Sequence, residues 1–360
     1  MKYLSEYRDP KLIEHYIAEL HKITTKTWNI MEICGGQTHS LVKNGILDIL
    51  PKKIQMIHGP GCPVCVTPLS LIDKAVTLLE KGFIVCSFGD MVRVPGSEKS
   101  LLEAKAEGGD LRILYSPLEA VHIAKDNPGK EVIFFAVGFE TTAPSNALSV
   151  LYAEKLGLTN FSLLVSHVLV PPAMEAILDD KFCNLHGFLA AGHVCAIMGM
   201  KEYEPLVKRY KIPIVVTGFE PVDIIEGIYF TVKQLEEGVY FLENQYSRIV
   251  KPEGNKAAKE AISKVFKIGS REWRGIGEIP ESGYVMRKEY EQFNAEVKFE
   301  VEKIKALKQT LCIAGDILRG KKKPKDCNQF GKKCKPDNPL GAPMVSSEGA
   351  CAAYYNFSDI

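Results

Sequence analysis

Seven of the ten cysteines in this 360-residue chain fall into three groups that could bind metal or carry out thiol chemistry. Their density is far below that of a disulfide-stapled scaffold, and a chain of this length can build a core without such staples. Thiolates are soft donors that suit iron, zinc or copper, and neighbouring thiols can form a reversible disulfide. The groups are Cys34; Cys62 with Cys65; and Cys312, Cys327, Cys334 and Cys351. We therefore expect metal binding or thiol redox chemistry.

Cys34 opens the string Cys-Gly-Gly-Gln-Thr-His-Ser, between a predicted strand at 29–33 and a predicted helix. Backbone N–H groups and the helix dipole at such a position lower the pKa of a thiol. The two glycines allow backbone amides to face a bound anion. These features predict an ionised, reactive thiol at neutral pH. The alternative is a buried structural cysteine in a tight turn.

Cys62 and Cys65 form a Cys-x-x-Cys motif after a second predicted strand, at 54–58. This spacing brings two sulfurs close enough to share one metal ion or to form a disulfide. A zinc ribbon would need a second such motif, and the sequence contains none. Because the carboxyl ends of parallel strands meet at one edge of a sheet, we expect both thiols to lie near Cys34.

The last four cysteines lie in a segment, after Leu311, that is rich in lysine, glycine and proline and has little apolar periodicity. Such a segment cannot build a core of its own, so we expect a metal centre to supply its fold. Gaps of 14, 6 and 16 residues separate the cysteines and match no ferredoxin spacing. The spacing leaves an iron–sulfur cluster and a zinc site both open. The lysines of 321–335 are interpreted as a solvated loop.

Several other residues with chemical potential also follow predicted strands. Asp90 and Arg93 could orient a ligand or exchange protons, and the alternative is a surface turn with a helix-capping acid. His193 is interpreted as a satisfied core histidine. Cys86 and Cys195 are expected to be packing residues.

Short β-branched runs alternate with amphipathic helical patterns from about residue 28 to residue 238. Strands separated by helix-length segments predict right-handed βαβ units and parallel sheets. The predicted strands are 29–33, 54–58, 83–88, 111–115, 132–137, 162–166, 187–190 and 212–217. A Gly-Phe-Glu string occurs twice, at 138–140 and 218–220, and each copy is interpreted as a strand-to-helix turn at a sheet edge.

The chain is too long for one ordinary core, so we expect several domains. The predicted fold is α/β, with two parallel-sheet domains and a small C-terminal domain around the four cysteines. We place the domains at 22–127 and 128–245, with a helical or irregular domain formed by 1–21 and 246–360. In the last range, two charged helical patterns surround a Gly/Pro-rich stretch at 275–283.

The composition is that of a folded globular protein and argues against a protein that binds nucleic acid or a membrane through its overall charge. Apolar residues make up 46% and charged residues 25%, as in folded globular proteins. The formal net charge of +1 gives no general attraction to nucleic acid or anionic membranes. No apolar run approaches the roughly 18–20 residues needed to span a bilayer, and the N-terminal residues show no secretory signal. We expect a soluble, cytoplasmic protein that binds neither nucleic acid nor membrane.

Six separated strings together resemble the HypD family of hydrogenase maturation factors, over nearly the whole chain. They are CGGQTHS at 34–40, HGPGCPVC at 58–65, FGDMVRVPG at 88–96, GFETTAP at 138–144, GFLAAGHVC at 187–195 and MVSSEGACAAY at 344–354. The resemblance implies two α/β domains and a third domain that holds a [4Fe-4S] cluster. It also implies a scaffold that assembles the Fe(CN)2CO unit of [NiFe]-hydrogenases with the small chaperone HypC. HypE would deliver cyanide as a thiocyanate, and HypF would act indirectly through HypE.

The resemblance also implies roles for individual residues. Cys34 would be the thiolate that holds the nascent iron, and Cys62 and Cys65 the neighbouring redox or metal-binding pair. The [4Fe-4S] cluster would be held by Cys312, Cys327, Cys334 and Cys351. Asp90 and Glu348 would be supporting acids.

Some family members carry histidine where this chain has Gln37, so a direct role for that position is doubtful. His39 is therefore the better imidazole candidate in the same motif.

Two other functions compete with the scaffold. A free-standing iron–sulfur thiol–disulfide oxidoreductase would explain the Cys62/Cys65 pair and the tail cysteines but leaves Cys34 unused. A nucleic-acid-binding iron–sulfur protein would use the tail lysines, but interleaved aromatic residues are lacking and the net charge is near zero. The sequence has no P-loop. We expect primarily an assembly scaffold with redox capability.

Overall fold

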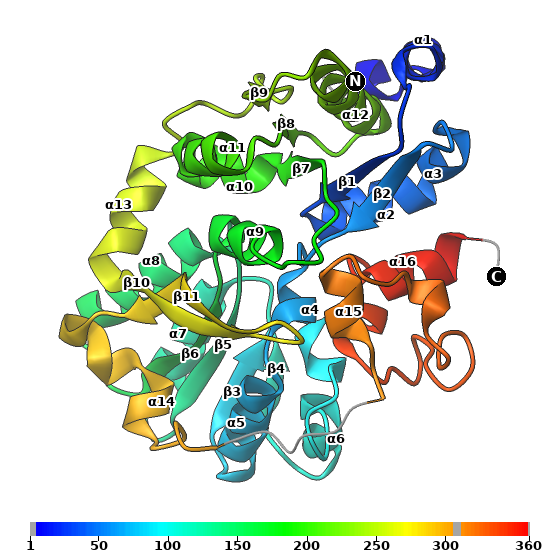
Figure 1. Ribbon diagram of the computed structural model, residues 1–360. Helices are drawn as coiled ribbons and strands as arrows, with labels where there is room; N and C mark the ends of the chain where they lie inside the picture. Colours follow the sequence, from blue (N-terminus) through cyan, green and yellow to red (C-terminus); the bar gives the residue numbers. More distant parts are fainter. Residues whose placement is uncertain (1–4, 305–310, 359–360) are drawn as a thin grey trace.

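The computed structural model describes residues 5–304 and 311–358 of the chain. Within these residues the strands form two parallel sheets and one antiparallel hairpin (Figure 1). Sheet A has the order β2-β1-β7-β8-β9, and sheet B has the order β4-β3-β5-β6. Sheet A consists of β1 (Trp28–Glu32), β2 (Ile54–His58), β7 (Gly187–Ala191), β8 (Ile214–Thr217) and β9 (Leu242–Asn244). Sheet B consists of β3 (Ile84–Ser87), β4 (Leu111–Ile113), β5 (Val132–Gly138) and β6 (Phe161–His167). The predicted α/β class with two parallel sheets is confirmed.

The sheets do not follow the sequential division expected at residue 127. The chain begins sheet A with β1 and β2, crosses to build the whole of sheet B, and returns to sheet A with β7. The ranges 22–127 and 128–245 therefore each contribute strands to both sheets. Local sequence patterns identify strands, but they do not encode which strands are neighbours.

Helices connect the strands, as parallel pairing requires. Every residue of β5 and β6 is buried, which is typical of parallel strands covered on both faces. The helices up to the end of sheet B are α1 (Pro10–Ile23), α2 (Gly35–Lys43), α3 (Ile46–Ile49), α4 (Pro63–Val66), α5 (Leu69–Glu80), α6 (Leu101–Ala106), α7 (Pro117–Asp126) and α8 (Ala143–Lys155). Those that follow are α9 (Val170–Leu178), α10 (Gly192–Met198), α11 (Glu204–Tyr210), α12 (Pro221–Glu237), α13 (Lys256–Val265) and α14 (Ala295–Lys298).

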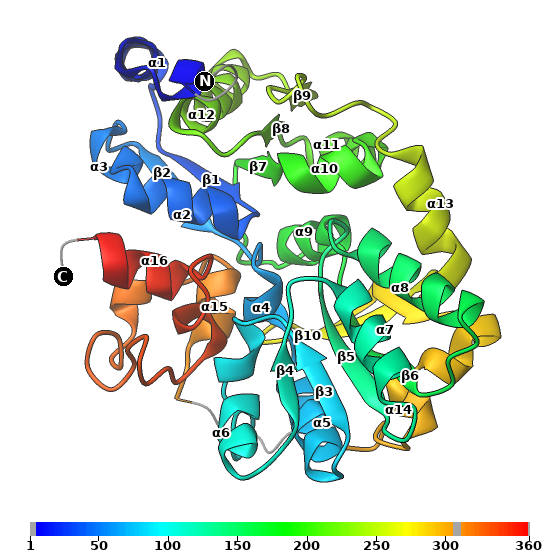
Figure 2. The ribbon, with the colours of Figure 1, turned by 180° about the vertical axis from the view of Figure 1, so that it is seen from behind.

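The segment after sheet A differs from the predicted pair of charged helices. Among the described residues of this segment, only α13 is a helix of the expected kind, and residues 266–286 instead form a hairpin of β10 (Phe266–Trp273) and β11 (Gly277–Met286). Gly275 and Gly277 both have positive φ in its turn, which glycine adopts without strain. The hairpin contacts α9 and β6, and α13 contacts α8, so these residues cover sheet B. Likewise α1 packs on α12 of the sheet A side (Figure 2).

The C-terminal segment carries α15 (Ala314–Leu318), a 3-10 turn (Ala342–Met344) and α16 (Ala350–Phe357). Both ribbon views show it beside α2 and α4, at one side of the two sheets, and contacts of α16 with α2 and of the 3-10 turn with α4 agree (Figures 1 and 2). Residues 1–4, 305–310 and 359–360 of the predicted third domain lie outside the described residues.

The two sheets share one apolar core, which contains Met31 of β1, Ile133 of β5 and Phe188 of β7. In the part of the chain that the structure describes, no helix is both long and apolar enough to cross a membrane.

Candidate functional site

The carboxyl edge of sheet A gathers the residues that follow its strands. Cys34 follows β1, Cys62 and Cys65 follow β2, His193 lies in the first turn after β7, and Phe219 follows β8. The strands are direct neighbours in the order β2-β1-β7-β8, and Glu32 at the end of β1 pairs in register with the last residue of β2. The expectation that Cys34 and the Cys-x-x-Cys motif share one sheet edge is confirmed.

Cys34 is buried and its Sγ faces the ring of His193, whose Nδ1 and Nε2 lie 3.9 and 3.8 Å away. The His193 ring stacks on Phe219, with ring centroids 4.9 Å apart. Burial raises the pKa of the Cys34 thiol, and nearby Glu348 and Glu32 raise it further. The N–H groups of α2 lower it, but by less.

The expected ionised thiol at neutral pH is therefore wrong for the metal-free chain, because desolvation outweighs the helix N-terminus. Iron would have to displace the proton of Cys34 on binding, as is general for thiolate ligands.

Glycines allow the turns after β1 and β2 to pack against each other and against the C-terminal segment. A Cβ atom on Gly61 would lie 2.2 Å from the backbone N of Cys34. One on Gly35 would lie 2.5 Å from the Cβ of Glu348. Since real side chains cannot approach so closely, both positions require glycine, and Cys34 lies between two segments far apart in sequence.

Cys62 and Cys65 are both buried, at 3% and 1% exposure. Cys62 caps the N-terminus of α4, and its Sγ accepts a hydrogen bond of 3.3 Å from the backbone N–H of Cys65. Burial raises the pKa of Cys65, and Cys62, Cys351 and Glu348 raise it further. Cys351 and Glu348 belong to the C-terminal segment, so the Cys62/Cys65 pair lies close to that segment.

Asp90 and Glu348 are brought together by one serine. Ser346 Oγ donates to Asp90 Oδ2 at 2.8 Å and accepts from the backbone N–H of Glu348 at 3.3 Å. Arg93 donates to the Val345 carbonyl at 3.1 Å. The loop after β3 of sheet B therefore holds the segment that covers Cys34, and the two expected supporting acids lie at the junction of three parts of the chain.

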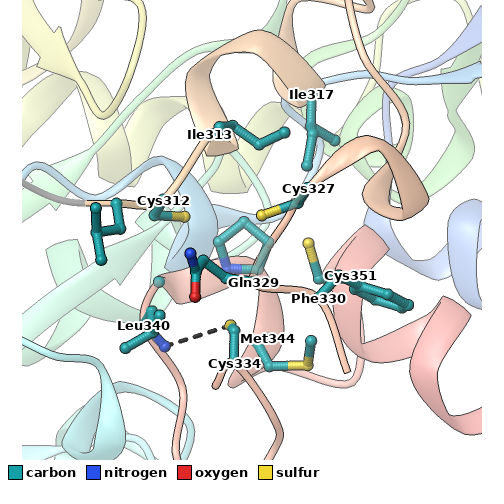
Figure 3. A pocket seen from close by; sticks show the side chains of 13 residues that line it. Cys312, Ile313, Ile317, Cys327, Gln329, Phe330, Cys334, Leu340, Met344 and Cys351 are labelled. Carbon is teal, nitrogen blue, oxygen red and sulfur yellow. Dashed lines mark hydrogen bonds between the residues drawn. The ribbon is translucent and has the colours of Figure 1, made fainter. Parts of the chain in front are cut away.

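The four C-terminal cysteines line one cavity of about 20 Å³, and Figure 3 shows their sulfur atoms directed toward a common space. Its other walls are largely apolar, including Ile313, Ile317 and Met344.

Two features show that these walls suit thiolates. Leu340 donates its backbone N–H to Cys334 Sγ at 3.4 Å. A Cβ on Gly341 would lie 2.2 Å from Cys312 Sγ, so only glycine leaves room for that sulfur. An apolar shell with amide donors aimed at sulfur fits an all-cysteine iron–sulfur centre. Among the described residues, no three His, Cys, Asp or Glu side chains are grouped so as to hold a single metal ion.

Comparison with known proteins decides the family. The family model for HypD, described as the hydrogenase formation hypA family, matches residues 11–358. The chain belongs to the HypD family. The hydrogenase expression/formation protein HupD of Azotobacter chroococcum is 46% identical over 367 residues, covering 99% of this chain and 97% of that protein. The hydrogenase maturation factors HypD of Azotobacter vinelandii and Escherichia coli K12 are 45% and 40% identical, each over 99% of this chain and over 97% and 98% of their own lengths.

Membership of the HypD family gives this chain a role in hydrogenase maturation, a process that involves other maturation proteins. The family match includes every cysteine discussed above.

In this HypD-family chain the imidazole beside Cys34 belongs to His193, not to His39. His39 lies on the outer side of α2, where Nδ1 is 3.2 Å from the Ser347 carbonyl oxygen and the ring packs edge-on against Phe357. Gln37 is buried and donates to Thr217 Oγ1 at 2.6 Å. The position of His193 after a strand was the available signal, but its meaning depended on knowing that β7 pairs with β1.

Proposed function

We propose that this chain is the scaffold on which the Fe(CN)2CO unit of [NiFe]-hydrogenases is assembled, with Cys34 holding the iron. The observation that carries the proposal is the position of Cys34 beside the imidazole of His193, at the edge of sheet A where Cys62 and Cys65 follow the neighbouring strand β2. Low-spin iron with cyanide and carbon monoxide ligands favours a soft sulfur donor.

The surroundings of Cys34 suit such cargo. His193 has its pKa lowered to about 4 by burial, so its ring is neutral at pH 7 and can accept or donate a hydrogen bond, or bind metal. The first turn of α2 presents backbone N–H groups beside Cys34, and cyanide nitrogens accept hydrogen bonds.

Other proteins complete the proposed reaction. A HypC-type small chaperone would supply the rest of the iron site, and a HypE-type donor, charged by a HypF-type partner, would bring cyanide as a thiocyanate. These steps belong in the cytoplasm and involve neither nucleic acid nor membrane.

Releasing cyanide from a thiocyanate requires two electrons, and the Cys62/Cys65 pair could provide them. The S–CN bond breaks as the two thiols close to a disulfide. One of their two protons goes to the sulfur of the donor, and the other leaves to solvent. A low-potential electron carrier must then reduce the disulfide.

We assign the [4Fe-4S] cluster to Cys312, Cys327, Cys334 and Cys351. A cluster binds each cysteine to a different iron and so keeps the sulfurs farther apart than a single ion does, which agrees with four thiols around one cavity. When bound, it would supply one-electron redox chemistry.

The alternative function is an iron–sulfur thiol–disulfide oxidoreductase without an iron cargo. The burial of Cys34 opposite His193 argues against it, since a dithiol enzyme has no use for that pair. Anaerobic co-purification with a HypC-type chaperone, followed by infrared spectroscopy, separates the two. The scaffold predicts bands of iron-bound cyanide and carbon monoxide in the complex. A pure complex with redox-active thiols but without those bands would support the oxidoreductase.

A further inference from the structure

A buried carboxylate lies directly behind Cys34. Glu32 ends β1 and is 0% exposed. Its Oε2 accepts the backbone N–H of Cys34 at 2.9 Å, and its Oε1 accepts the hydroxyl of Thr38 on α2. One carboxylate thus fixes both the backbone of Cys34 and the helix that follows it.

The same carboxylate is joined to the neighbouring strand. His58 ends β2, pairs in register with Glu32, and places Nδ1 2.7 Å from Glu32 Oε1. It is only 4% exposed. The two side chains share a hydrogen bond whichever of them carries the proton, and the second ring nitrogen, Nε2, is left for another partner.

The hydrogen-bond partner of His58 Nε2 is a residue near the C-terminal end of the chain. Tyr354 Oη lies 3.0 Å from His58 Nε2, and the two rings pack edge to face with centroids 5.3 Å apart. Tyr354 belongs to α16, one helical turn after Cys351, a cysteine that lines the four-cysteine cavity. A continuous path of hydrogen bonds therefore runs from α16 through His58 and Glu32 to the Cys34 backbone.

Stability alone does not account for this path. Replacing a buried polar network by apolar residues of similar size is often neutral or stabilising, whereas removing one member leaves its partner without a hydrogen bond. The three residues come from three separate segments, so the path fixes how those segments sit relative to one another.

We propose that Glu32, His58 and Tyr354 are positioning residues that couple helix α16, and thereby the four-cysteine cavity, to the backbone of Cys34. Ordering of α16 by an occupied cavity sets the Tyr354 hydroxyl against His58, which holds Glu32 on the Cys34 N–H. The coupling deepens the proposed function, on which it rests for its role in iron assembly.

The test is amide hydrogen–deuterium exchange, measured by mass spectrometry on the anaerobic full-length protein with its cluster reconstituted. Tyr354→Phe keeps the ring and removes only the hydroxyl. We expect exchange in the segment 34–38 to become roughly 2- to 10-fold faster, the effect of losing one ordinary hydrogen bond, with the cluster absorbance unchanged.

The matched control is Tyr355→Phe, the same change at the next residue of α16, where the ring packs near Phe330 instead. It should leave exchange at 34–38 unchanged. Equal rates in wild type and Tyr354→Phe, or equal acceleration by both variants, would overturn the proposal.

A second arm tests the coupling itself. Cys327→Ala disturbs the cavity at a residue that belongs neither to α16 nor to the path of hydrogen bonds. It should accelerate exchange at 34–38 in the wild-type background and add nothing further in the Tyr354→Phe background. Additive effects of the two changes, or no effect of Cys327→Ala on 34–38, would contradict it.

Neither readout requires iron cargo or hydrogenase. Absence of cyanide and carbon monoxide bands would thus defeat the proposed function alone, and absence of the exchange effects would defeat the coupling alone.

Discussion

His193 is the side chain that gives Cys34 a chemical environment beyond burial. It approaches Sγ within 4 Å, stacks on Phe219 and is kept neutral by burial. His39, in the cysteine's own motif, contacts the C-terminal segment instead. At the scale of single residues, the surroundings of Cys34 thus come from residues that follow different strands, not from one sequence motif.

We predict that His193→Leu folds but lowers retention of iron on the scaffold by about 10- to 100-fold, as for lost partners at metal sites. Iron analysis of the anaerobic chaperone complex, corrected for cluster iron, measures this. His39→Leu is the control and should have a much smaller effect. Equal losses in both variants would show that the imidazole beside the thiol has no special role.

The dithiol should react asymmetrically. Cys62 Sγ accepts a hydrogen bond from a backbone N–H at a helix N-terminus, whereas burial, the neighbouring thiols and Glu348 raise the pKa of Cys65. Cys62 should therefore be alkylated first, and the pair should interconvert between thiol and disulfide. Mass spectrometry after alkylation at controlled potential follows both. Thiols that stay reduced at every accessible potential would limit the pair to metal binding or structure.

The residue types and motif positions of this site could be predicted from sequence, and its electrostatics could not. The order strand–Cys34–helix is local information, and it correctly placed the thiol at a sheet edge. The raised pKa of Cys34 comes first from burial and then from Glu348, a residue of the C-terminal segment more than 300 positions away along the chain. Glu32, His58 and Tyr354 were missed for the same reason.

At the scale of elements, the two Gly-Phe-Glu turns each connect a strand to a helix, but their glutamates lie in different surroundings. Both follow a strand and precede a helix, as predicted. Glu140 is 2% exposed, and its Oε1 accepts the Val170 N–H at 2.9 Å, while Oε2 has no hydrogen-bond partner among the described residues. Glu220 instead pairs with Arg8 near the surface.

We predict that Glu140→Gln stabilises the protein at pH 7.5 but not at pH 4.5. Burial raises the pKa of Glu140 to about 7, from an ordinary value of 4.5. As the pH rises between these values, the unfolded state releases a proton that the folded state keeps, so stability falls. The neutral amide avoids this loss, for a gain on the order of 2–3 kcal/mol above pH 7.

Urea unfolding at the two pH values measures the gain. Glu220→Gln is the matched control and should cost no more than about 1 kcal/mol, the usual worth of an exposed ion pair. A Glu140→Gln variant equally destabilised at both pH values would contradict a buried, protonated carboxyl.

Element identity was predictable where the pattern was strong. All eight predicted strands exist, because buried parallel strands are continuous apolar runs. The hairpin at 266–286 was missed because its strands are rich in charged and polar residues and bury few apolar ones, so they lack the regular alternation that identifies a strand. Strand β9 has only three residues and half-buried side chains, and it gives no pattern at all.

At the scale of the whole molecule, the C-terminal segment contacts both the helices that follow β1 and β2 of sheet A and the loop that follows β3 of sheet B. It carries the four-cysteine cavity, covers Cys34 through Glu348, and contacts α2 and α4. The missing apolar periodicity predicted a metal centre there. Local patterns reveal neither the position of this segment beside α2 and α4 nor the way in which the chain leaves sheet A and returns to it.

We predict that Cys327→Ala or Cys334→Ala removes the broad visible absorbance of a cluster and loosens residues 311–358. Cys183→Ala, at a half-buried cysteine outside the cavity, should leave the absorbance intact. Absorbance and Mössbauer spectra of the anaerobic proteins measure this. A tail variant that keeps a full cluster would show that the cavity is not its site.

The most direct measurement is infrared spectroscopy of the anaerobic chaperone complex in wild type, Cys34→Ser and Cys86→Ser. Serine keeps the size of Cys34 but offers a hard, poorly ionising donor. Cys86 is buried within β3, where the same change should cost stability of about 1–3 kcal/mol but leave the cargo site intact. The account predicts cyanide and carbon monoxide bands in wild type and Cys86→Ser and none in Cys34→Ser, with the tail cluster present in all three. Bands of normal intensity in Cys34→Ser would contradict it.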